Sequence, residues 1–398
     1  MTLPSSQQDT VNAPQYNVQY VVVGGGMVGS AAALGLAQLG YQVVLLEAFP
    51  AAEFAPEQKP DLRMSALAHA SVQLLDDLGA WEAIQALRVQ PYTHLSVWEA
   101  DWSETTFSAT EVGHEILGYF AENRITQLGL AATIAKQPNI TVLNTQAVRV
   151  NSVAGKVWCA DGQVIQADWI IAADGAQSQV RQQSGIATVG WQYDQQAMGI
   201  TVKNYYRDDV YAERAQATTW QQFLPSGPVA FLPMHDQHAS LIWYDDPQVL
   251  MELKTLDDAA LKARIKAHFP AVVGEFSIID KAVFPIHRMH AQQYIKDKVI
   301  LIGDAAHAIN PLAGQGVNLG FADVACLLKA LANEQSLHRH YELPRRIANG
   351  QMMTAMDGFY HLFSNHNPVL KPLRNIGLFL AQRGGWAKKH VIKKAMGL

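Results

Sequence analysis

The sequence GGGMVG at positions 24–29 joins two segments of different character, and this junction constrains the fold more than any other feature. Before it, Tyr20–Val23 is a short, β-rich apolar run, and after it Ala31–Leu39 consists of helix-forming residues. A second β-rich run follows at Gln42–Glu47. A strand, a glycine turn, a helix and a second strand within about thirty residues form one βαβ unit. The chain is therefore expected to contain an α/β domain of the Rossmann type.

The spacing of these glycines matches G-x-G-x-x-G and indicates a dinucleotide. Gly24 permits the tight turn, Gly26 lets backbone approach a pyrophosphate, and Gly29 lets helix and strand pack closely. Val28, in the same turn, is also expected to contact the cofactor. Free N–H groups at the helix start attract phosphates. Glu47 ends the second strand, twenty-one residues after Gly26, where a carboxylate suits ribose hydroxyl groups and repels a 2′-phosphate. The alternative is a glycine turn without a ligand; otherwise the ligand carries an ADP moiety, as in FAD or NAD.

Asp304 follows another buried strand, Val299–Ile302, and distinguishes between these two dinucleotides. Ligands of parallel sheets bind beyond the carboxyl ends of the strands. A carboxylate there does not serve a phosphate, but it suits the ribityl hydroxyl groups of FAD. The next loop carries Pro311 and Gly314, and a helix is expected to begin near Val317, where its free amides would stabilise charge on a reduced flavin. The alternative is that these residues only form a helix cap and a turn.

The composition is typical of a folded globular protein in a reducing compartment. Among 398 residues, 49% are apolar and 16% charged, which allows two or three domains with a substantial core. The net charge of −5 argues against a nucleic-acid partner. Cys159 and Cys326 are too few for a disulfide framework. The first residues lack a signal-peptide pattern and no long apolar run occurs, so a cytoplasmic protein is expected.

Changes in sequence pattern indicate that the α/β domain is interrupted. Between Tyr193 and Pro285 the chain consists of longer alternating strands with one helix, which is typical of an antiparallel sheet. The segment after about Ser336 is mostly helical. We therefore expect a discontinuous Rossmann-like cofactor domain (17–90, 121–186 and 289–335), an inserted antiparallel β-sheet substrate domain (91–120 and 187–288), a helical C-terminal region (336–398) and a flexible leader (1–16).

Three motifs in this order resemble the flavoprotein aromatic hydroxylases with the p-hydroxybenzoate hydroxylase fold. They are the glycine turn with Glu47, ADGAQSQVR at 173–181 and GDAAHAINPLAGQGVN at 303–318. Further segments, among them DLRMSALAHASVQLLDDLGAW, TTWQQFLPSGPVAFLPM and FSNHNP, are similar to the branch of this family that acts in ubiquinone biosynthesis. The resemblance covers nearly the whole chain after the polar leader and implies an FAD-binding fold with an inserted substrate domain.

The resemblance also implies where individual residues meet FAD. Asp304 is expected at the ribityl and pyrophosphate groups, and Asp174 with Gly175 in a loop shared by FAD and the incoming nicotinamide. Arg63 and Arg124 are expected to approach FAD, although an arginine without this context more often forms a surface ion pair. The remaining implied contacts are Val148 with the adenine, through its backbone, and, along the isoalloxazine, Pro311, Gly314, Gln315, Gly316, Val317 and Asn318.

The reaction implied by the resemblance is ring hydroxylation by a monooxygenase. NADH or NADPH reduces FAD, O2 then forms a flavin hydroperoxide, and one oxygen atom passes to the ring of a lipophilic polyprenyl methoxy-methyl-benzoquinol. The cofactor carries the difficult chemistry, so no residue is assigned as an acid or base. Gln222, Phe231 and Trp243 are candidates for the substrate pocket, although an aromatic residue in a strand is more often part of the core.

Two further features concern metals and partners. His287 and His290 are three residues apart, but no third ligand is evident nearby, so no metal is expected. Residues 371–398 contain seven Lys/Arg and no Asp or Glu, together with IGLFLAQ and Trp386. Such a basic amphipathic tail suits a peripheral contact with the inner face of a membrane or with a quinone-biosynthesis complex. The alternative is a solvated surface helix.

Other functions stay open at this level. A halogenase of the same fold should contain W-x-W-x-I-P, and this sequence does not. A flavin reductase of the same fold, or a hydroxylase of another aromatic compound, would show the same flavin motifs. A flavin-binding subunit of a biosynthetic complex, with little activity of its own, is an alternative of a different class.

Overall fold

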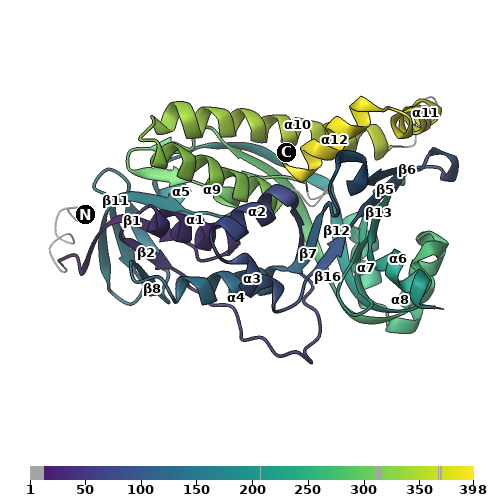
Figure 1. Ribbon diagram of the computed structural model, residues 1–398, viewed down its shortest axis with the longest axis horizontal. Coiled ribbons are helices and arrows are strands. Elements are labelled where there is room, and N and C mark those ends of the chain that lie inside the picture. The colour runs from purple at the N-terminus through teal and green to yellow at the C-terminus, as the bar shows by residue number, and fades with distance from the viewer. Residues whose placement is uncertain (1–12, 207, 311–315, 366, 368–369) are drawn as a thin grey trace, which may run out of the picture.

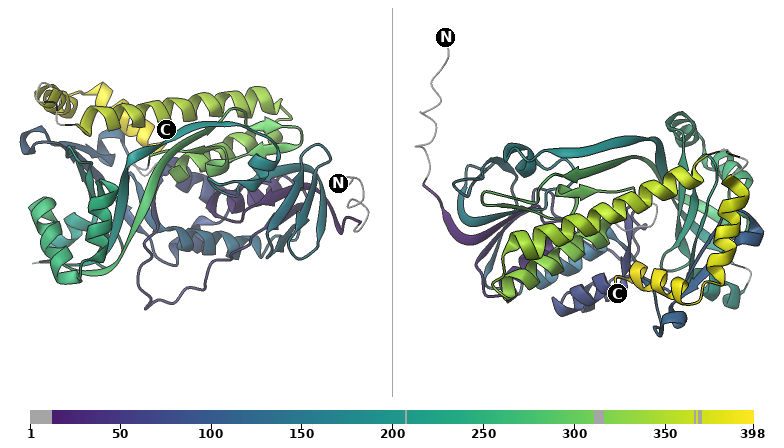
Figure 2. Two further views of the ribbon diagram at one scale, coloured as in Figure 1. Left: turned by 180° about the vertical axis from the view of Figure 1, so that it is seen from behind. Right: turned by 90° about the horizontal axis from the view of Figure 1, so that it is seen from above.

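The structure is a computed structural model that describes residues 13–206, 208–310, 316–365, 367 and 370–398. In this part of the chain two large sheets lie side by side, and a long helix runs along both of them (Figure 1). The C-terminal helices reach the end of the molecule that is formed by the second sheet (Figure 2).

The first sheet contains the predicted βαβ unit. Its strands β1, β2, β8, β11 and β18 pair in parallel, while a short hairpin extends one edge and two antiparallel strands join β11. All four residues of β2 are buried, as expected of a parallel strand that is covered on both faces. The strands are β17 (Ile295–Lys296), β18 (Val299–Leu301), β11 (Val164–Ala172), β1 (Tyr16–Val23), β2 (Val43–Leu46) and β8 (Ile140–Leu143), with β9 (Ala147–Asn151) and β10 (Lys156–Cys159).

The second sheet is antiparallel except for one parallel pair, β13 with β5. The long strands β12 and β16, of 18 and 17 residues, pair with each other and connect this sheet to the first one. The order is β19 (His307–Ala308), β16 (Glu275–Ala291), β12 (Thr188–Tyr205), β15 (His238–Asp245), β14 (Val229–Pro233), β13 (Thr218–Gln222), β5 (His94–Trp98) and β6 (Thr105–Ser108). A small third sheet contains β3 (Met64–Ala68), β7 (Gly118–Glu122) and β4 (Gln90–Tyr92).

Helices cover the first sheet and the outer face of the second (Figure 1). The helices of the first sheet and its surroundings are α1 (Met27–Gln38), α2 (His69–Asp77), α3 (Trp81–Gln85), α4 (Asn123–Ile134), α5 (Gln179–Gln183) and α9 (Gly316–Ala332). Those against the second sheet, on the side away from the first, are α6 (Asp209–Gln216), α7 (Pro247–Thr255) and α8 (Asp258–His268). The C-terminal helices are α10 (Leu343–Phe363), α11 (Leu370–Gln382) and α12 (Trp386–Met396).

The expected fold class is confirmed, and several elements have the expected bounds. Short β-rich runs at Ile140–Leu143, Ala147–Asn151 and Lys156–Cys159 predict three strands, which are observed as β8, β9 and β10, and the turn at 160–162 joins β10 to β11 as a hairpin. The helical pattern over Ser71–Leu87 predicts one helix, but the structure has two, α2 and α3, with Gly79 between them at φ +70°. Two helices next to the second sheet, α6 and α7, were not expected. The proposed domain boundaries stay a prediction.

Candidate functional site

The glycine turn has the close backbone packing that its sequence predicts. Gly24 follows β1 with φ +102°, and a Cβ atom there would lie 2.4 Å from the carbonyl oxygen of Ala173. A Cβ at Gly29 would lie 1.9 Å from the carbonyl oxygen of Gly24. At Gly26, by contrast, the nearest atom would be Gln127 Nε2 at 3.9 Å. Gly26 also precedes α1 without any side-chain cap, so open space and free N–H groups meet where a pyrophosphate is expected.

Glu47 lies directly against this turn. It follows β2, and a Cβ atom at Gly25 would come within 2.8 Å of the Glu47 Cβ. Its Oε1 accepts a hydrogen bond of 2.7 Å from the Phe49 amide, which fixes the carboxylate while leaving it half-buried. The geometry therefore suits the expected ribose contact.

Asp304 occupies the expected place beyond the carboxyl end of β18. It lies in a 3-10 turn, Gly303–Ala305, that is made possible by the φ of +56° at Gly303. Its side chain is accessible to solvent, yet desolvation by the surrounding protein raises its pKa, against the opposing influence of His307, His287 and Arg63. A carboxyl that is accessible and still poorly solvated is typical of the floor of a hollow. Because they influence this pKa, His307, His287 and Arg63 lie near the Asp304 carboxyl.

The first and third motifs meet at Val28, in the first turn of α1. A Cβ at Gly303 would lie 3.2 Å from Val28 Cγ1, and a Cβ at Gly320 only 2.6 Å from Val28 Cγ2. The glycine at position 320 therefore lets α9 approach α1 and the Asp304 turn. The contacts of Val28 are those of a packing residue, and its expected contact with the cofactor stays a prediction.

At Gly316, where α9 begins, an added Cβ would meet no described residue within 4 Å. The next residue is the half-buried Val317. The Asn318 side chain anchors this turn: Oδ1 accepts from the Ala68 amide at 2.9 Å, and Nδ2 donates to the Ala66 carbonyl at 2.8 Å. The remaining loop residues that were expected along the isoalloxazine, Pro311, Gly314 and Gln315, lie outside the described residues.

The second motif forms a loop that is tied to the Asp304 turn. Asp174 Oδ2 accepts from the Val180 amide at 3.1 Å, whereas its buried Oδ1 has no hydrogen-bond partner among the described residues. Gly175 follows with φ +81°. The buried Arg181 donates to the carbonyl groups of Ala305 and Ala176, each at 2.8 Å, and burial lowers its pKa. Sequence analysis did not single out Arg181, although it ends the quoted motif ADGAQSQVR.

The two candidate arginines differ in their surroundings. Arg124 forms an ion pair of 2.8 Å with Asp61 and donates to the carbonyl groups of Ala52 and Glu53, so it holds the loop between β2 and β3. The exposed Arg63 lies near Asp304 and over the ring of Phe284, 5.7 Å from its centroid. A direct contact of either arginine with FAD stays a prediction.

Val148 and the three substrate candidates belong to other strands than those that precede the three motifs. Val148 is exposed, and its carbonyl accepts from Gln183 Nε2 at 3.2 Å. Phe231 and Trp243 are 3% and 2% exposed and belong to the core under α7 and α8, where Trp243 stacks on His268. Gln222 is half-buried at the end of β13. Their role in a substrate pocket is untested, and the packing of the two aromatic residues favours the core.

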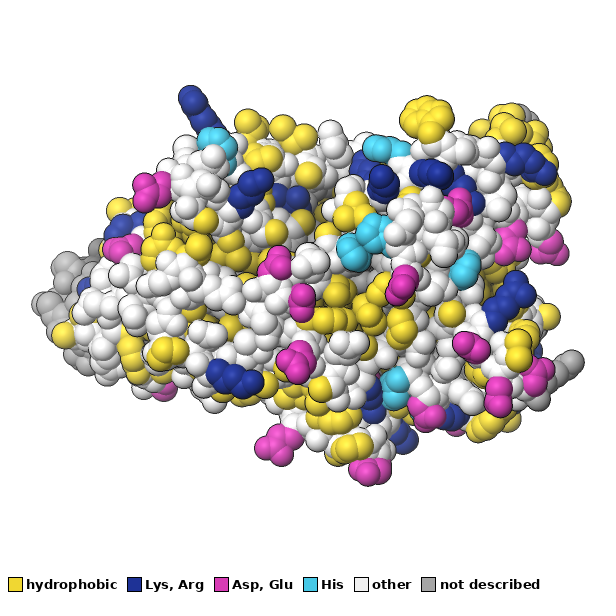
Figure 3. All heavy atoms as spheres, in the orientation of Figure 1, with side chains coloured by type: hydrophobic (Ala, Val, Ile, Leu, Met, Phe, Trp, Pro, Cys, Tyr) yellow, Lys and Arg dark blue, Asp and Glu magenta, His cyan; other side chains and the backbone are white. Residues whose placement is uncertain are grey.

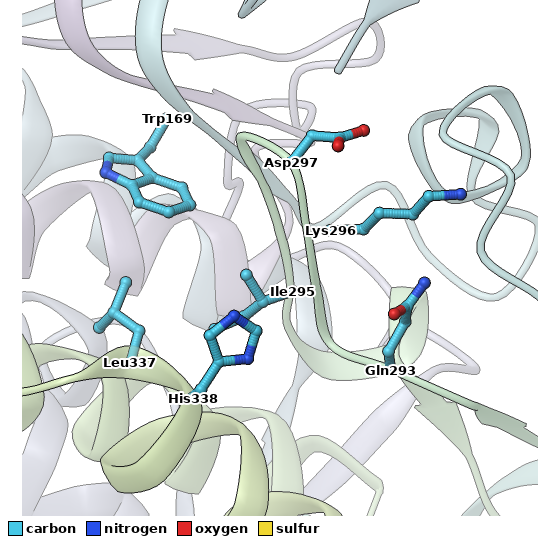
Figure 4. A pocket seen from close by; sticks show the side chains of 7 residues that line it. All are labelled: Trp169, Gln293, Ile295, Lys296, Asp297, Leu337 and His338. Atoms are coloured by element: carbon cyan, nitrogen blue, oxygen red, sulfur yellow. The ribbon is translucent and has the colours of Figure 1, made fainter. Parts of the chain in front are cut away.

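Two hollows in the described chain lie apart from these motifs. One of about 420 Å³ is beside the amino end of β18, whereas Asp304 follows its carboxyl end (Figure 4). Its lining side chains are Trp169, Gln293, Ile295, Lys296, Asp297, Leu337 and His338. Another of about 600 Å³ lies between the loop 56–60 and the turn 235–238. Neither contains a residue of the three motifs.

The described residues suit FAD. The space at Gly26, the unpartnered Asp174 Oδ1, the accessible Asp304 and Gly316 lie at the ends of β1, β11 and β18 and at the start of α9, where a parallel sheet binds its ligand. Among these residues there is no group of three or more His, Cys, Asp or Glu that could hold a metal ion. In the same residues, no helix combines the length and apolar character needed to cross a membrane.

Comparison with known proteins agrees with this geometry. Residues 17–353 match the family model described as FAD binding domain. The chain is 41% identical over 392 residues to 3-demethoxyubiquinol 3-hydroxylase of Escherichia coli (strain K12), with 96% of this chain and 98% of the relative covered. It is 30% identical to the ubiquinone biosynthesis monooxygenase COQ6, mitochondrial, of Xenopus tropicalis, over 90% of this chain and 89% of that protein.

Solved structures show the same fold at lower identity. A p-nitrophenol 4-monooxygenase, PnpA from Pseudomonas putida DLL-E4, superposes with a TM-score of 0.77 at 18% identity, over 96% of this chain and 99% of that chain. The structure of pqsL, a probable FAD-dependent monooxygenase from Pseudomonas aeruginosa, gives 0.68 at 21% identity, over 91% and 99%. With the motifs assembled as described, the chain belongs to the FAD-binding-domain family, in the branch of the ubiquinone-biosynthesis hydroxylases, and is an FAD-dependent monooxygenase.

Proposed function

We propose that this enzyme hydroxylates the ring of a polyprenyl methoxy-methyl-benzoquinol in ubiquinone biosynthesis, with FAD, NADH or NADPH, and O2. The observation that carries this is the 41% identity to the Escherichia coli 3-demethoxyubiquinol 3-hydroxylase over 96% of the chain. The flavin-facing motifs that this chemistry needs converge at one edge of the first sheet.

In this proposal the residues bind and orient, and FAD when bound supplies the redox and oxygen chemistry. Amides at the start of α1 hold the pyrophosphate, and Glu47 holds the ribose. Asp304 orients the ribityl chain, and the first turn of α9 directs the positive end of its helix dipole towards the flavin ring, where it stabilises negative charge. Asp174 and Gly175 lie in the loop assigned to the nicotinamide. No side chain is assigned as an acid or base.

The ring substrate is placed against the part of the second sheet that carries Ile242 and Phe284 on one face. Tyr244, on the same face, is buried in a cluster with Met356 of α10. Strand alternation separates this face from the one with Phe231 and Trp243, because successive side chains point to opposite sides. The Phe231 and Trp243 face is covered by α7 and α8. The other face includes Phe284, over which Arg63 lies, and Arg63 is near Asp304. The Ile242 face therefore looks towards the flavin site.

A lipophilic quinol resides in a membrane, and α11 has the surface that such a substrate requires of its enzyme. Two of its polar residues face inwards: the buried Arg374 pairs with Glu99, and Asn375 Oδ1 accepts from Ser103 Oγ at 2.6 Å. Its apolar residues are exposed instead. We call this surface the apolar face of α11, which consists of Leu373, Ile376, Phe379 and Leu380.

Basic residues surround this surface. Lys371 and Arg383 are exposed at the two ends of α11, Lys389 is exposed on α12, and Trp386 is 82% exposed at the start of α12. Hydrophobic and basic side chains are interspersed where α11 and α12 lie (Figure 3). Apolar side chains inserted between lipid headgroups, together with cations attracted to anionic lipid, describe a peripheral membrane contact. The proposed partner of this surface is therefore an anionic bilayer.

The test of the enzymatic proposal is single-turnover oxygenation. The purified protein, loaded with FAD, is reduced anaerobically by NADH or NADPH and mixed with oxygen in the presence of a short-chain methoxy-methyl-benzoquinol. The expected product is heavier by one oxygen atom, and isotope from 18O2 is incorporated into it. Reoxidation of the flavin with unchanged quinol would contradict the proposed substrate and favour a reductase or a hydroxylase of another aromatic compound. Parallel reactions without quinol measure uncoupled oxygen consumption.

A further inference from the structure

A fully buried carboxylate lies directly behind the Asp304 turn. Asp323 is in the middle of α9, and its side chain has no exposed surface. It is the only acidic residue in this helix. Because a buried charge is costly unless it is paired and hydrogen-bonded, the groups around Asp323 show what its carboxylate does.

Four donors from two separate segments, 303–307 and α10, point at this carboxylate. Oδ2 accepts from the Gly303 amide at 3.0 Å and from His307 Nε2 at 2.6 Å. Oδ1 accepts from Arg345 Nε at 2.7 Å and from Asn349 Nδ2 at 3.2 Å. The ionised carboxylate can only accept, so Nε2 of His307 carries the hydrogen. Burial by itself would raise the pKa of Asp323, but His307 and Arg345 hold it below the ordinary value.

The positions of these donors determine what the cluster holds in place. Gly303 and His307 lie on either side of Asp304, so the carboxylate fixes both ends of the short segment that carries the flavin-facing side chain. Arg345 and Asn349 belong to α10 and complete the cluster from behind. Asp323 also lies one turn after Gly320, at the close approach of α9 to Val28 and to the Gly303 backbone.

Net stability does not account for such a cluster, because the cost of desolvating buried ions commonly offsets their attraction. We propose that Asp323 is a positioning residue of the flavin site: it holds the 303–307 segment in the conformation that presents Asp304 to FAD, and it thereby sets the affinity for FAD. This role depends on FAD being the cofactor and is independent of the identity of the ring substrate.

The test uses Asp323→Asn, which keeps the shape and removes the charge. An asparagine oxygen accepts at most two of the four hydrogen bonds, and its amide group opposes the remaining donors. The Kd for FAD is measured by quenching of flavin fluorescence on the apoprotein, whose folding is monitored by circular dichroism. We expect the Kd to rise about ten- to a hundredfold, as when the supporting hydrogen bonds behind metal ligands are removed. Saturating FAD should then restore most of the rate of NAD(P)H oxidation.

Glu99→Gln is the matched control. Glu99 is also a buried carboxylate that pairs with an arginine and accepts from an asparagine amide, here Arg374 and Asn375, but it anchors α11 and has no hydrogen bond or ion pair with the described residues of the flavin motifs. We expect this variant to lose thermal stability with an unchanged Kd for FAD. If Asp323→Asn and Glu99→Gln both lower the Tm and both leave the Kd of the folded protein at the wild-type value, Asp323 has only a structural role and the proposal is wrong.

Should Asp323→Asn fail to fold, Arg345→Lys decides the question. This change keeps the positive charge next to Asp323 but removes the Nε donor to Oδ1 and the second donor, to the Leu319 carbonyl. A folded Arg345→Lys protein with a raised Kd for FAD supports the positioning role. A folded variant with the wild-type Kd contradicts it.

Discussion

A Cβ atom added at Gly26 would meet very different surroundings from one added at Gly29. Alanine substitutions at these two positions therefore distinguish an effect on cofactor binding from an effect on folding. A Cβ at Gly29 would collide with the carbonyl oxygen of Gly24 at 1.9 Å, whereas at Gly26 it would have room and an ordinary φ of −63°. We expect Gly26→Ala to leave the Tm of the apoprotein nearly unchanged and to raise the Kd for FAD by about tenfold or more, since one displaced phosphate contact of 1.4 kcal/mol has that effect. Gly29→Ala should lower the Tm as well. Thermal melts and FAD titrations measure both.

Gly358→Ala controls for the exchange of glycine for alanine itself. Gly358 is exposed in α10 and an added Cβ would meet nothing within 4 Å. In an exposed helix interior, alanine stabilises by about 0.5–1 kcal/mol relative to glycine. We expect a slightly higher Tm and an unchanged Kd for FAD. An equal loss of affinity in Gly26→Ala and Gly358→Ala would show that the open space at Gly26 does not receive the cofactor.

His290 should make the folded state sensitive to acid. Burial, together with the charges of His307, Arg288 and Arg346, lowers its pKa to about 4, and its Nε2 lies 2.8 Å from the Tyr294 hydroxyl. In the unfolded chain the pKa of a histidine is about 6.5. As the pH falls from that value towards 4, only the unfolded state takes up the proton, so the free energy of unfolding decreases.

Urea unfolding at a series of pH values measures this effect. We expect the stability of the wild type to decline through this range, and His290→Gln to remove part of the decline because it cannot titrate. A decline of the same steepness in both proteins would assign the acid sensitivity to other groups, of which His235 is one, because burial and Arg88 lower its pKa to about 4 as well.

For helices and strands, the sequence predicts that an element forms better than it predicts which face of that element points towards the site. The βαβ unit and the strand before Asp304 follow from local patterns of glycine and apolar residues, which act over a few positions. Which face of β15 turns to the flavin depends on α7 and α8 covering the other face, and no local pattern contains that information. Phe231 and Trp243 were therefore natural candidates from their residue types alone.

Among the site residues, too, some are predicted by a local sequence pattern and others only by their tertiary contacts. The glycine turn, Glu47 and Asp304 carry a local signature, and the structure brings them to one edge of the sheet. Arg181 and Asp323 act by joining segments that are distant in sequence, and only their tertiary contacts reveal this. A single acidic residue within the apolar helix α9 was the available signal for Asp323.

Substitutions on the two faces of β15 test on which face the ring substrate binds. Ile242 is half-buried on the face that is proposed to receive the ring substrate, and Trp243 is buried against α7 and α8. We expect Ile242→Trp to raise the KM for the quinol several-fold by filling the ring site, with little change in Tm. Trp243→Ala should lower the stability by about 3–5 kcal/mol through a core cavity, with the KM of the remaining folded enzyme unchanged. Steady-state kinetics and thermal melts distinguish the two; the reverse pattern would place the ring on the other face.

The whole molecule combines a net charge of −5 with a C-terminal segment, 371–398, that has seven Lys/Arg and no acidic residue. This asymmetry gives the protein one end that anionic lipid attracts while the rest is repelled. The C-terminal helices lie at the end of α10, which also supplies Arg345 and Asn349 to the Asp323 cluster. A bilayer contact there would hold the enzyme where a lipophilic quinol is found.

Sedimentation with lipid vesicles tests whether the basic C-terminal segment binds anionic lipid. We expect binding to vesicles that contain anionic phosphatidylglycerol, little binding to pure phosphatidylcholine, and weaker binding as salt screens the attraction. Leu373→Gln combined with Leu380→Gln should abolish most of the binding, because it removes two side chains from the apolar face of α11. Lys389→Gln should reduce it about fivefold, which corresponds to about 1 kcal/mol per basic residue near an anionic surface.

The matched control removes two equally exposed apolar side chains elsewhere. Val210→Gln combined with Met251→Gln alters α6 and α7, on the far side of the second sheet. This double variant should bind vesicles as the wild type does. If it lost binding to the same extent as the α11 double variant, the association would be a general effect of surface hydrophobicity. If neither pair of substitutions changed a measurable binding, the bilayer would contact another surface, and the exposed apolar face of α11 would instead serve a protein partner of the biosynthetic complex.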